Sequence, residues 1–146
     1  MPDAVVFPDS HQDVVETLRL CYREKIPVIA RGRGTGTTGA TVPVGGGIVL
    51  STERMTRILE VAPEDRLMVV EPGVTNQAIQ EAAAEQGFFW PPDPTSAAVC
   101  TVGGNLAYNS AGPRAVKYGT PRENTLGLRA VTGTGKEIQT GVRTTK

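Results

Sequence analysis

A run of nine residues with four glycines constrains this chain more than any other feature. It occupies residues 31–39 (RGRGTGTTG) and follows Val28-Ile29-Ala30, a short apolar run that predicts a buried strand. The pattern Gly34-x-Gly36-x-x-Gly39 formally matches a dinucleotide-binding fingerprint. That fingerprint must open a helix, whose N-terminus carries the pyrophosphate. Pro43 and the three glycines at 45–47 exclude such a helix, so we set the ordinary Rossmann interpretation aside.

A pyrophosphate can also be held without a helix, by several backbone N–H groups that point at one spot. Glycines at alternate positions form such a concave nest, because their φ is unrestricted and no side chain blocks the approach. Thr35 and Thr37 add hydroxyl donors, and Arg31 and Arg33 can add charge. A second glycine pair, at 103–104, stands at a predicted helix start. Two nests suit an extended diphosphate, whereas the alternative is that these glycines only mark tight turns.

The rest of the chain alternates strand and helix signals. We expect strands at 4–7, 28–30, 47–50, 57–61 and 67–71, and a hairpin of 128–132 with 137–140. Ser10 with Asp13 predicts a helix start, and that helix should run to about Lys25, before Pro27. A second helix is expected from a Thr75 cap through Gln86, and a short third one from Gly103. The first strand, helix and second strand form a β-α-β unit, which predicts a parallel pair.

Composition excludes several functional classes. The formal net charge is zero and no Lys/Arg block occurs, so nothing indicates nucleic-acid binding. With one histidine and no CxxC, His and Cys cannot build a zinc site. Cys21 and Cys100 can pair, but we expect reduced thiols in a cytoplasmic protein. No apolar run is long enough for a membrane span, and the N-terminus lacks a signal-peptide pattern.

Five segments, in this order and spacing, resemble the FAD-binding (PCMH-type) domain of the vanillyl-alcohol oxidase superfamily. They are PVIARGRGTGT at 27–37, VEPGV at 70–74, PDPTS at 92–96, TVGGNLAYNSAG at 101–112 and KYG at 117–119. Within the superfamily the chain is most similar to the FAD subunit of glycolate oxidase and to D-lactate dehydrogenases. The resemblance covers nearly the whole chain. It implies one α+β domain over 1–146, built from two α/β subdomains with FAD extended between them.

The resemblance also implies which residues contact FAD. The segment 32–37 would form the pyrophosphate loop, and 92–96 and 103–112 would line the rest of the path. The expected cofactor-binding residues are Arg31, Gly32, Arg33, Gly34, Thr35, Gly36, Thr37, Pro92, Pro94, Thr95, Gly103, Gly104, Asn109, Ser110 and Gly112. Lys117 is similar in position to a basic residue near the flavin in relatives, although a surface lysine is the plainer interpretation. Some relatives attach flavin through a histidine in the loop. Thr35 stands there instead, so we expect dissociable, non-covalent FAD.

By this resemblance, the parent enzyme oxidises a small D-2-hydroxy acid, glycolate or D-lactate, to the 2-oxo acid by hydride transfer to FAD. Glu53, Glu60, Glu71 and Glu123 show no acid–base constellation, so we name no catalytic residue and no metal ligand. The family's domain continues past Lys146 into a substrate-handling cap. We therefore expect a C-terminally truncated chain that is inactive alone and self-associates through its open sheet edge.

Two other functions stay open: an NADPH-dependent reductase resembling UDP-N-acetylenolpyruvoylglucosamine reductase, and a truncated domain that binds no flavin. The 92–96 and 117–119 segments argue against the reductase. Expected partners are the hydroxy acid and an electron acceptor or further oxidase subunits, which would also bring a cytoplasmic protein to the periphery of the inner membrane.

Overall fold

The computed structural model describes residues 1–144 and begins with a parallel three-stranded sheet. Its strands are β1 (Ala4–Val6), β2 (Val28–Arg31) and β3 (Ile48–Ser51), with helix α1 (His11–Glu24) between β1 and β2. The order is β1-β3-β2, so β3 lies between the first two strands and pairs with both. The predicted β-α-β unit is therefore parallel, but β1 and β2 do not pair with each other. Short-range sequence patterns cannot show that a later strand inserts between two earlier ones.

Both ends of α1 follow the sequence signals. The Ser10 hydroxyl accepts a hydrogen bond from Asp13 N (3.2 Å), and the Asp13 carboxylate accepts one from Ser10 N (2.9 Å), which completes a capping box. Lys25 ends the helix in the left-handed region at φ 59°. Val15 and Cys21 are the buried residues of α1. The predicted helix is confirmed to within a residue at each end.

Two antiparallel hairpins follow the parallel sheet. Strands β4 (Ile58–Ala62) and β5 (Leu67–Val70) form one, which joins two strands that were predicted separately. Strands β6 (Gly127–Val131) and β7 (Glu137–Gly141) form the other, the hairpin that the sequence predicted. Between them lie α2 (Asn76–Glu85), capped by Thr75, and α3 (Val102–Tyr108), capped by Thr101. The sequence did not predict the last helix, α4 (Ala115–Tyr118), which is a single turn with no buried residue. The predicted α+β fold class is confirmed.

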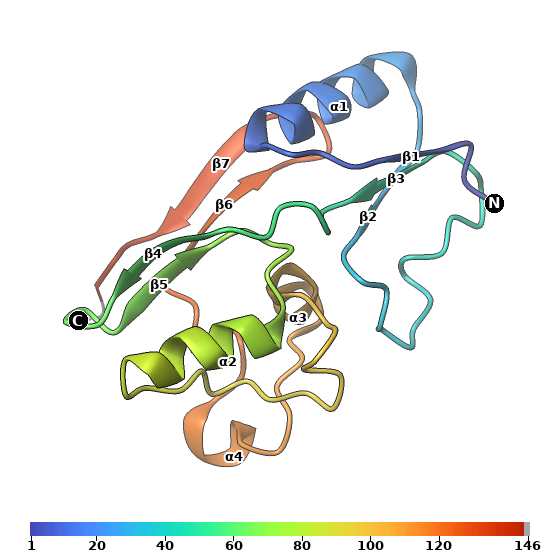
Figure 1. Ribbon diagram of the computed structural model, residues 1–146. Helices are drawn as coiled ribbons and strands as arrows, with labels where there is room; N and C mark the ends of the chain where they lie inside the picture. The colour runs from blue at the N-terminus through green and yellow to red at the C-terminus, as the bar shows by residue number, and fades with distance from the viewer. Residues whose placement is uncertain (145–146) are drawn as a thin grey trace.

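The main apolar cluster lies where α2 and α3 meet the β4–β5 hairpin. Val74, Ile79 and Val102 are its buried members, and Trp90 and Leu106 are among the residues packed against it. Burying each aliphatic side chain contributes about 1.5–3 kcal/mol. An isolated bridge between Thr75 and Thr101 joins the starts of the two helices. In Figure 1, α2, α3 and α4 lie on one side of the strands and α1 lies on the other.

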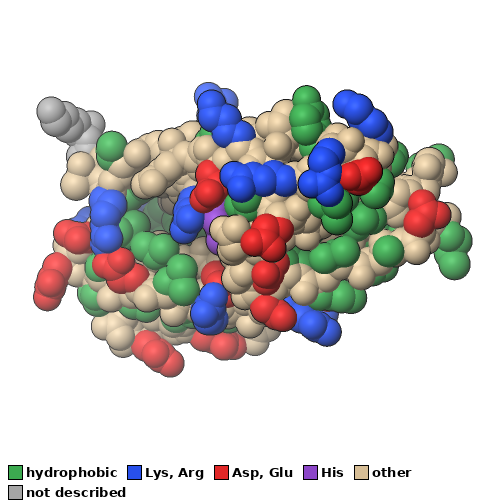
Figure 2. Space-filling view, turned by 90° about the horizontal axis from the view of Figure 1, so that it is seen from above, with side chains coloured by type: hydrophobic (Ala, Val, Ile, Leu, Met, Phe, Trp, Pro, Cys, Tyr) green, Lys and Arg blue, Asp and Glu red, His purple; other side chains and the backbone are tan. Residues whose placement is uncertain are grey.

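Polar contacts join α1 to the β6–β7 hairpin. Glu137 Oε2 lies 2.8 Å from His11 Nε2 and 3.0 Å from Arg129 Nη2. Farther along α1, Arg19 Nε donates to Gly135 O at 3.1 Å. The face seen from above carries interspersed charges of both signs (Figure 2). Across residues 1–144, no helix combines the length and apolar character that a membrane crossing requires.

Candidate functional site

The glycine-rich segment forms an irregular loop from residue 32 to residue 47, between β2 and β3. No helix follows Gly39, so the structure agrees with the rejection of the Rossmann interpretation. Gly34 adopts φ +67°, a conformation that L-residues rarely take. The Arg31 guanidinium lies against Gly34, with Nη1 2.9 Å from the place where a Cβ would stand. The loop thus folds back on the last residue of β2.

This loop lies along α3 and contacts both of its ends. At the helix start, Gly32 is so close to Thr101 that an added Cβ would overlap the threonine hydroxyl. At the helix end, a Cβ on Gly36 would lie 2.8 Å from the Tyr108 ring, and the Tyr108 hydroxyl is 2.9 Å from Thr38 Oγ1. The sequence pattern did not single out Thr101 or Tyr108. Their i, i+7 spacing puts them on one helix face, a signal that becomes visible only once the helix is placed.

Three buried polar side-chain atoms near this contact have no hydrogen-bond partner among residues 1–144. They are Thr101 Oγ1 at the N-cap of α3, Asn105 Nδ2 on α3, and Ser51 Oγ at the end of β3. Thr101 and Asn105 are each 2% exposed, and Thr101 makes no side-chain cap bond to its helix. Leaving such a group unpaired costs about 1–3 kcal/mol. Gly32 covers the Thr101 hydroxyl, so the loop would have to shift from α3 for a ligand to reach that atom. The hydrogen-bonding groups of these side chains fit a phosphate-bearing cofactor.

The two glycines at the start of α3 differ in role. Gly103 N donates to Pro72 O (2.9 Å), and a Cβ there would lie 2.8 Å from Pro72 Cβ, so Gly103 serves packing. Gly104 instead faces the Thr101 hydroxyl, 3.4 Å from an added Cβ, and its N–H donates to no backbone carbonyl outside the helix within residues 1–144. Of the predicted second nest, only the Gly104 amide is free.

The other predicted segments, 92–95 and 109–112, lie side by side. Asp93 N donates to Ala111 O at 2.7 Å, and Gly112, at φ +81°, approaches so closely that a Cβ would overlap Asp93 O. Pro92 O accepts hydrogen bonds from the side-chain amides of Asn76 and Gln80, both at 3.1 Å. These prolines and their partners hold an extended path against the chain that leaves α3.

Asn109 and Ser110 connect that path to α3. Asn109 ends the helix at φ 53°, and its Oδ1 accepts a hydrogen bond from Arg122 N at 3.1 Å. Ser110 N donates to Asn105 O at 2.8 Å. Pro94 O accepts from Ala97 N at 2.9 Å, and Thr95 is exposed beside it. The three predicted segments thus converge on one short helix.

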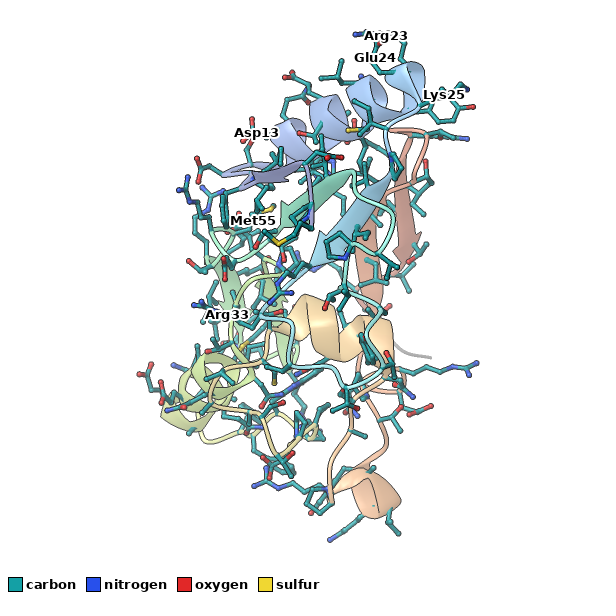
Figure 3. All side chains as sticks on the ribbon, turned by 90° about the vertical axis from the view of Figure 1, so that its right-hand side faces the viewer. Asp13, Arg23, Glu24, Lys25, Arg33 and Met55 are labelled. Atoms are coloured by element: carbon teal, nitrogen blue, oxygen red, sulfur yellow. The ribbon has the colours of Figure 1, made fainter. Side chains whose placement is uncertain are left out.

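Two arginines at the start of the loop, Arg31 and Arg33, differ in whether an acidic side chain already pairs with them. Arg33 pairs with Glu53 at 3.1 Å, whereas Arg31 has no ion-pair partner among residues 1–144. Figure 3 labels Arg33 within the loop. Thr35 and Thr37 are exposed. Arg31, the last residue of β2, is therefore a cation beside the loop whose charge is free for a ligand.

The glutamates in which the sequence showed no acid–base arrangement form hydrogen bonds or ion pairs within the fold. Glu71, nearly buried, accepts two hydrogen bonds from the Arg57 guanidinium and one from Arg57 N. The Arg57 side chain holds the pKa of Glu71 below its ordinary value of 4.5. Glu60 pairs with Arg143, and Glu123 accepts bonds from Thr120.

The possible metal ligands, the two cysteines and Lys117 complete the set of candidate reactive groups. Within the described part of the chain, no group of three or more His, Cys, Asp or Glu side chains could hold a metal ion. Cys21 and Cys100 are buried free thiols, as expected. Lys117 is exposed on α4, and its Nζ lies 5.0 Å from the centroid of the Tyr118 ring. This position agrees with the plainer interpretation, a surface lysine.

Comparison with known proteins relates this geometry to a family. The sequence model described as "FAD binding domain" matches residues 2–141. The glycolate oxidase subunit GlcD of Bacillus subtilis is 39% identical over 146 residues, which is 100% of this chain and 31% of that protein. The D-lactate dehydrogenase of Archaeoglobus fulgidus is 44% identical over 142 residues, which is 97% of this chain and 32% of that protein. The chain thus spans about a third of the length of these relatives.

Solved structures share the fold. A structure of alkyldihydroxyacetonephosphate synthase superposes with a TM-score of 0.84 at 27% identity, over 95% of this chain and 25% of that one. A grass pollen allergen with glucose dehydrogenase activity, Phl p 4, also reaches a TM-score of 0.84, over 93% of this chain and 28% of that one. Its identity of 19% supports the fold alone.

Proposed function

The chain belongs to the FAD binding domain family, and from this membership we propose that it is the flavin-holding part of an oxidoreductase acting on a small D-2-hydroxy acid. FAD is the cofactor. Glycolate and D-lactate are the proposed substrates, because similar proteins are a glycolate oxidase subunit and a D-lactate dehydrogenase. The whole gene product would yield the 2-oxo acid, whereas this chain alone would only hold the flavin.

The observation that carries the proposal is the contact of the 32–38 loop with both ends of α3. In the proposed site the cofactor's diphosphate follows this loop, and its oxygens accept hydrogen bonds from loop amides and from Gly104 N–H. Arg31 supplies the compensating positive charge, and Thr35 and Thr37 supply hydroxyls. Arg33 would have to leave Glu53 in order to contribute.

The remaining predicted contacts extend the same path. Bound FAD would supply the hydride-accepting chemistry, and the protein would supply its placement. The 92–95 and 109–112 segments are tied together by the Asp93–Ala111 hydrogen bond, so they would form one rigid wall for the ligand. Loop and wall meet at α3, and the unpaired Thr101 and Asn105 groups would gain partners there. The cofactor would be dissociable, with Thr35 at the place where covalent relatives carry histidine.

The visible spectrum tests cofactor binding. The purified chain should be yellow or become so with added FAD, with perturbed flavin bands and quenched fluorescence. After denaturation and filtration, all of the flavin should pass the membrane, because no bond holds it. A chain that remains colourless with excess FAD would mean a domain without flavin, which is the non-enzymatic alternative that the sequence left open.

Turnover by the whole gene product tests the substrate. Glycolate and D-lactate should bleach the bound flavin without oxygen, and NADPH should not; bleaching by NADPH alone would favour the reductase. Electrons would leave to an acceptor or to partner oxidase subunits. Such subunits, rather than a span within this chain, would bring it to the inner membrane.

A further inference from the structure

Two side chains on one face of α2 hold the extended segment of residues 90–95. Asn76 and Gln80 are four residues apart, so they lie on the same side of the helix. Both side-chain amides donate to Pro92 O at 3.1 Å. Gln80 Nε2 also donates to Trp90 O. The chain that leaves α2 runs back along the helix (Figure 1), which brings these two carbonyls within reach of α2.

The 90–95 segment has few hydrogen-bond donors of its own. Pro91, Pro92 and Pro94 have no backbone N–H, so the stretch cannot be held by a regular helix or strand ladder. The same prolines have a restricted φ and keep the residues before them extended, which makes the segment stiff. Fixing the carbonyls at its start therefore also fixes the course of the residues that follow.

The stiff segment extends the influence of α2 to the proposed FAD site. Asp93 N donates to Ala111 O at 2.7 Å, and Ala111 belongs to the chain that leaves α3. Pro94 and Thr95, which come next, are among the expected cofactor contacts. A series of hydrogen bonds thus leads from α2 through the segment to the end of α3.

Gln80 and Asn76 differ in burial and in the number of carbonyls they hold. Asn76 is completely buried, so its replacement would also disturb the core. Gln80 is half-buried, and its amide group has two hydrogens, one for each of its two carbonyl partners. The hydrogen bonds of Gln80 can therefore be removed with little change in packing.

We infer that Gln80 is a positioning residue for FAD, which keeps the 92–95 segment where the cofactor needs it. The inference rests on the proposed function. Without the two hydrogen bonds of Gln80, the segment would leave its place for part of the time. Only chains with the segment in place would bind FAD at full affinity, so the measured dissociation constant would rise in proportion.

Matched substitutions on α2 test this role, measured where circular dichroism shows every variant to be folded. Gln80→Met keeps a side chain of similar length but removes both donors, so FAD affinity should fall about tenfold. Gln77→Met makes the same change at an exposed position, where the amide bonds to Glu81 of the same helix, and affinity should stay within about twofold. Gln80→Lys restores N–H donors and should recover at least half of the loss on a logarithmic scale. Equal affinities for the two methionine variants, or no recovery with lysine, overturn the inference.

The single tryptophan of the chain separates positioning from general stability. Trp90 O accepts a hydrogen bond from Gln80, so acrylamide quenching of Trp90 fluorescence reports whether the segment stays in place. In the FAD-free chain, quenching should increase for Gln80→Met and not for Gln77→Met.

The two measurements together decide between the outcomes. Increased quenching with unchanged FAD affinity would show a structural role alone and overturn the inference. Weaker FAD binding without increased quenching would mean that Gln80 does not act through the segment, and would overturn it as well. If the unchanged chain itself binds no FAD, the proposed function fails and the inference fails with it.

Discussion

Gly32 and Thr101, far apart in the sequence, are in such close contact that no side chain larger than hydrogen fits between them. The contact joins the end of the parallel sheet to the first turn of α3. It also covers the unpaired Thr101 hydroxyl. The proposed cofactor path thus depends on two residues of which one, Thr101, has no distinctive sequence pattern.

Gly32→Val should therefore abolish most FAD binding. Its Cβ would overlap the Thr101 hydroxyl and push the loop from α3, so we expect a loss of affinity of at least about tenfold in a fluorescence titration. Gly45→Ala is the matched control, because nothing lies within 4 Å of a Cβ there. Similar affinities for the two variants would contradict the proposed loop placement.

We expect the ring of Tyr108 to contribute more to FAD binding than its hydroxyl does. Tyr108→Phe removes only the exposed bond to Thr38 and should cost about 0.5–1 kcal/mol of FAD binding. Tyr108→Ala also removes the ring that packs on Gly36 and should cost more. Isothermal titration of both variants ranks them, and a larger loss for Phe than for Ala would refute this division.

Gly112→Ala should destabilise the fold itself. The residue has φ +81° and its Cβ would overlap Asp93 O, so we expect a loss of about 1–3 kcal/mol in the free energy of unfolding. Gly133→Ala, in the β6–β7 turn, meets nothing within 4 Å and should be almost neutral. Urea unfolding of the two variants gives the comparison.

The Glu71–Arg57 pair should make stability depend on acid pH. The pKa of Glu71 is lowered in the folded state, so its contribution is complete above the ordinary value of 4.5 and is lost as pH falls below it. Glu71→Gln should therefore be less stable than the unchanged chain at pH 7, with the gap closing toward acid pH. Glu64→Gln, at an exposed position, should show no such gap in denaturant midpoints. A gap that widened as the pH fell would be opposite in sign to this expectation and would refute it.

Self-association is expected through exposed apolar side chains of the β4–β5 hairpin. Leu59, Val61 and Val69 are 56%, 40% and 36% exposed there, on a hairpin of only two strands. Sedimentation velocity should show larger species as protein concentration rises, and Val61→Lys should reduce them. Glu64→Lys adds positive charge in the hairpin turn and controls for charge alone. A chain that sediments as a monomer at every concentration would contradict this prediction.

Local signals predicted the elements well, because their causes are local. The Ser10–Asp13 capping box, the Thr75 cap and the turn between β6 and β7 each act within a few residues. The insertion of β3 between β1 and β2 was not predicted, because strand order follows from packing between distant segments. The contacts of Thr101 with Gly32 and of Tyr108 with Gly36 were not predicted for the same reason, since each joins segments far apart in the sequence.

The order β1-β3-β2 also governs what the glycine-rich loop must do. Because β2 and β3 are adjacent and parallel, the chain leaves the sheet at one end and has to travel its full length back before β3 can start. The first portion, up to Thr38, contacts Thr101 and Tyr108, whereas in the returning portion a Cβ on Gly39 or Gly45 would meet nothing within 4 Å. Insertions or deletions in the returning portion would leave the first portion in place against α3. We therefore expect the loop of relatives to vary in length after Thr38 and not before it.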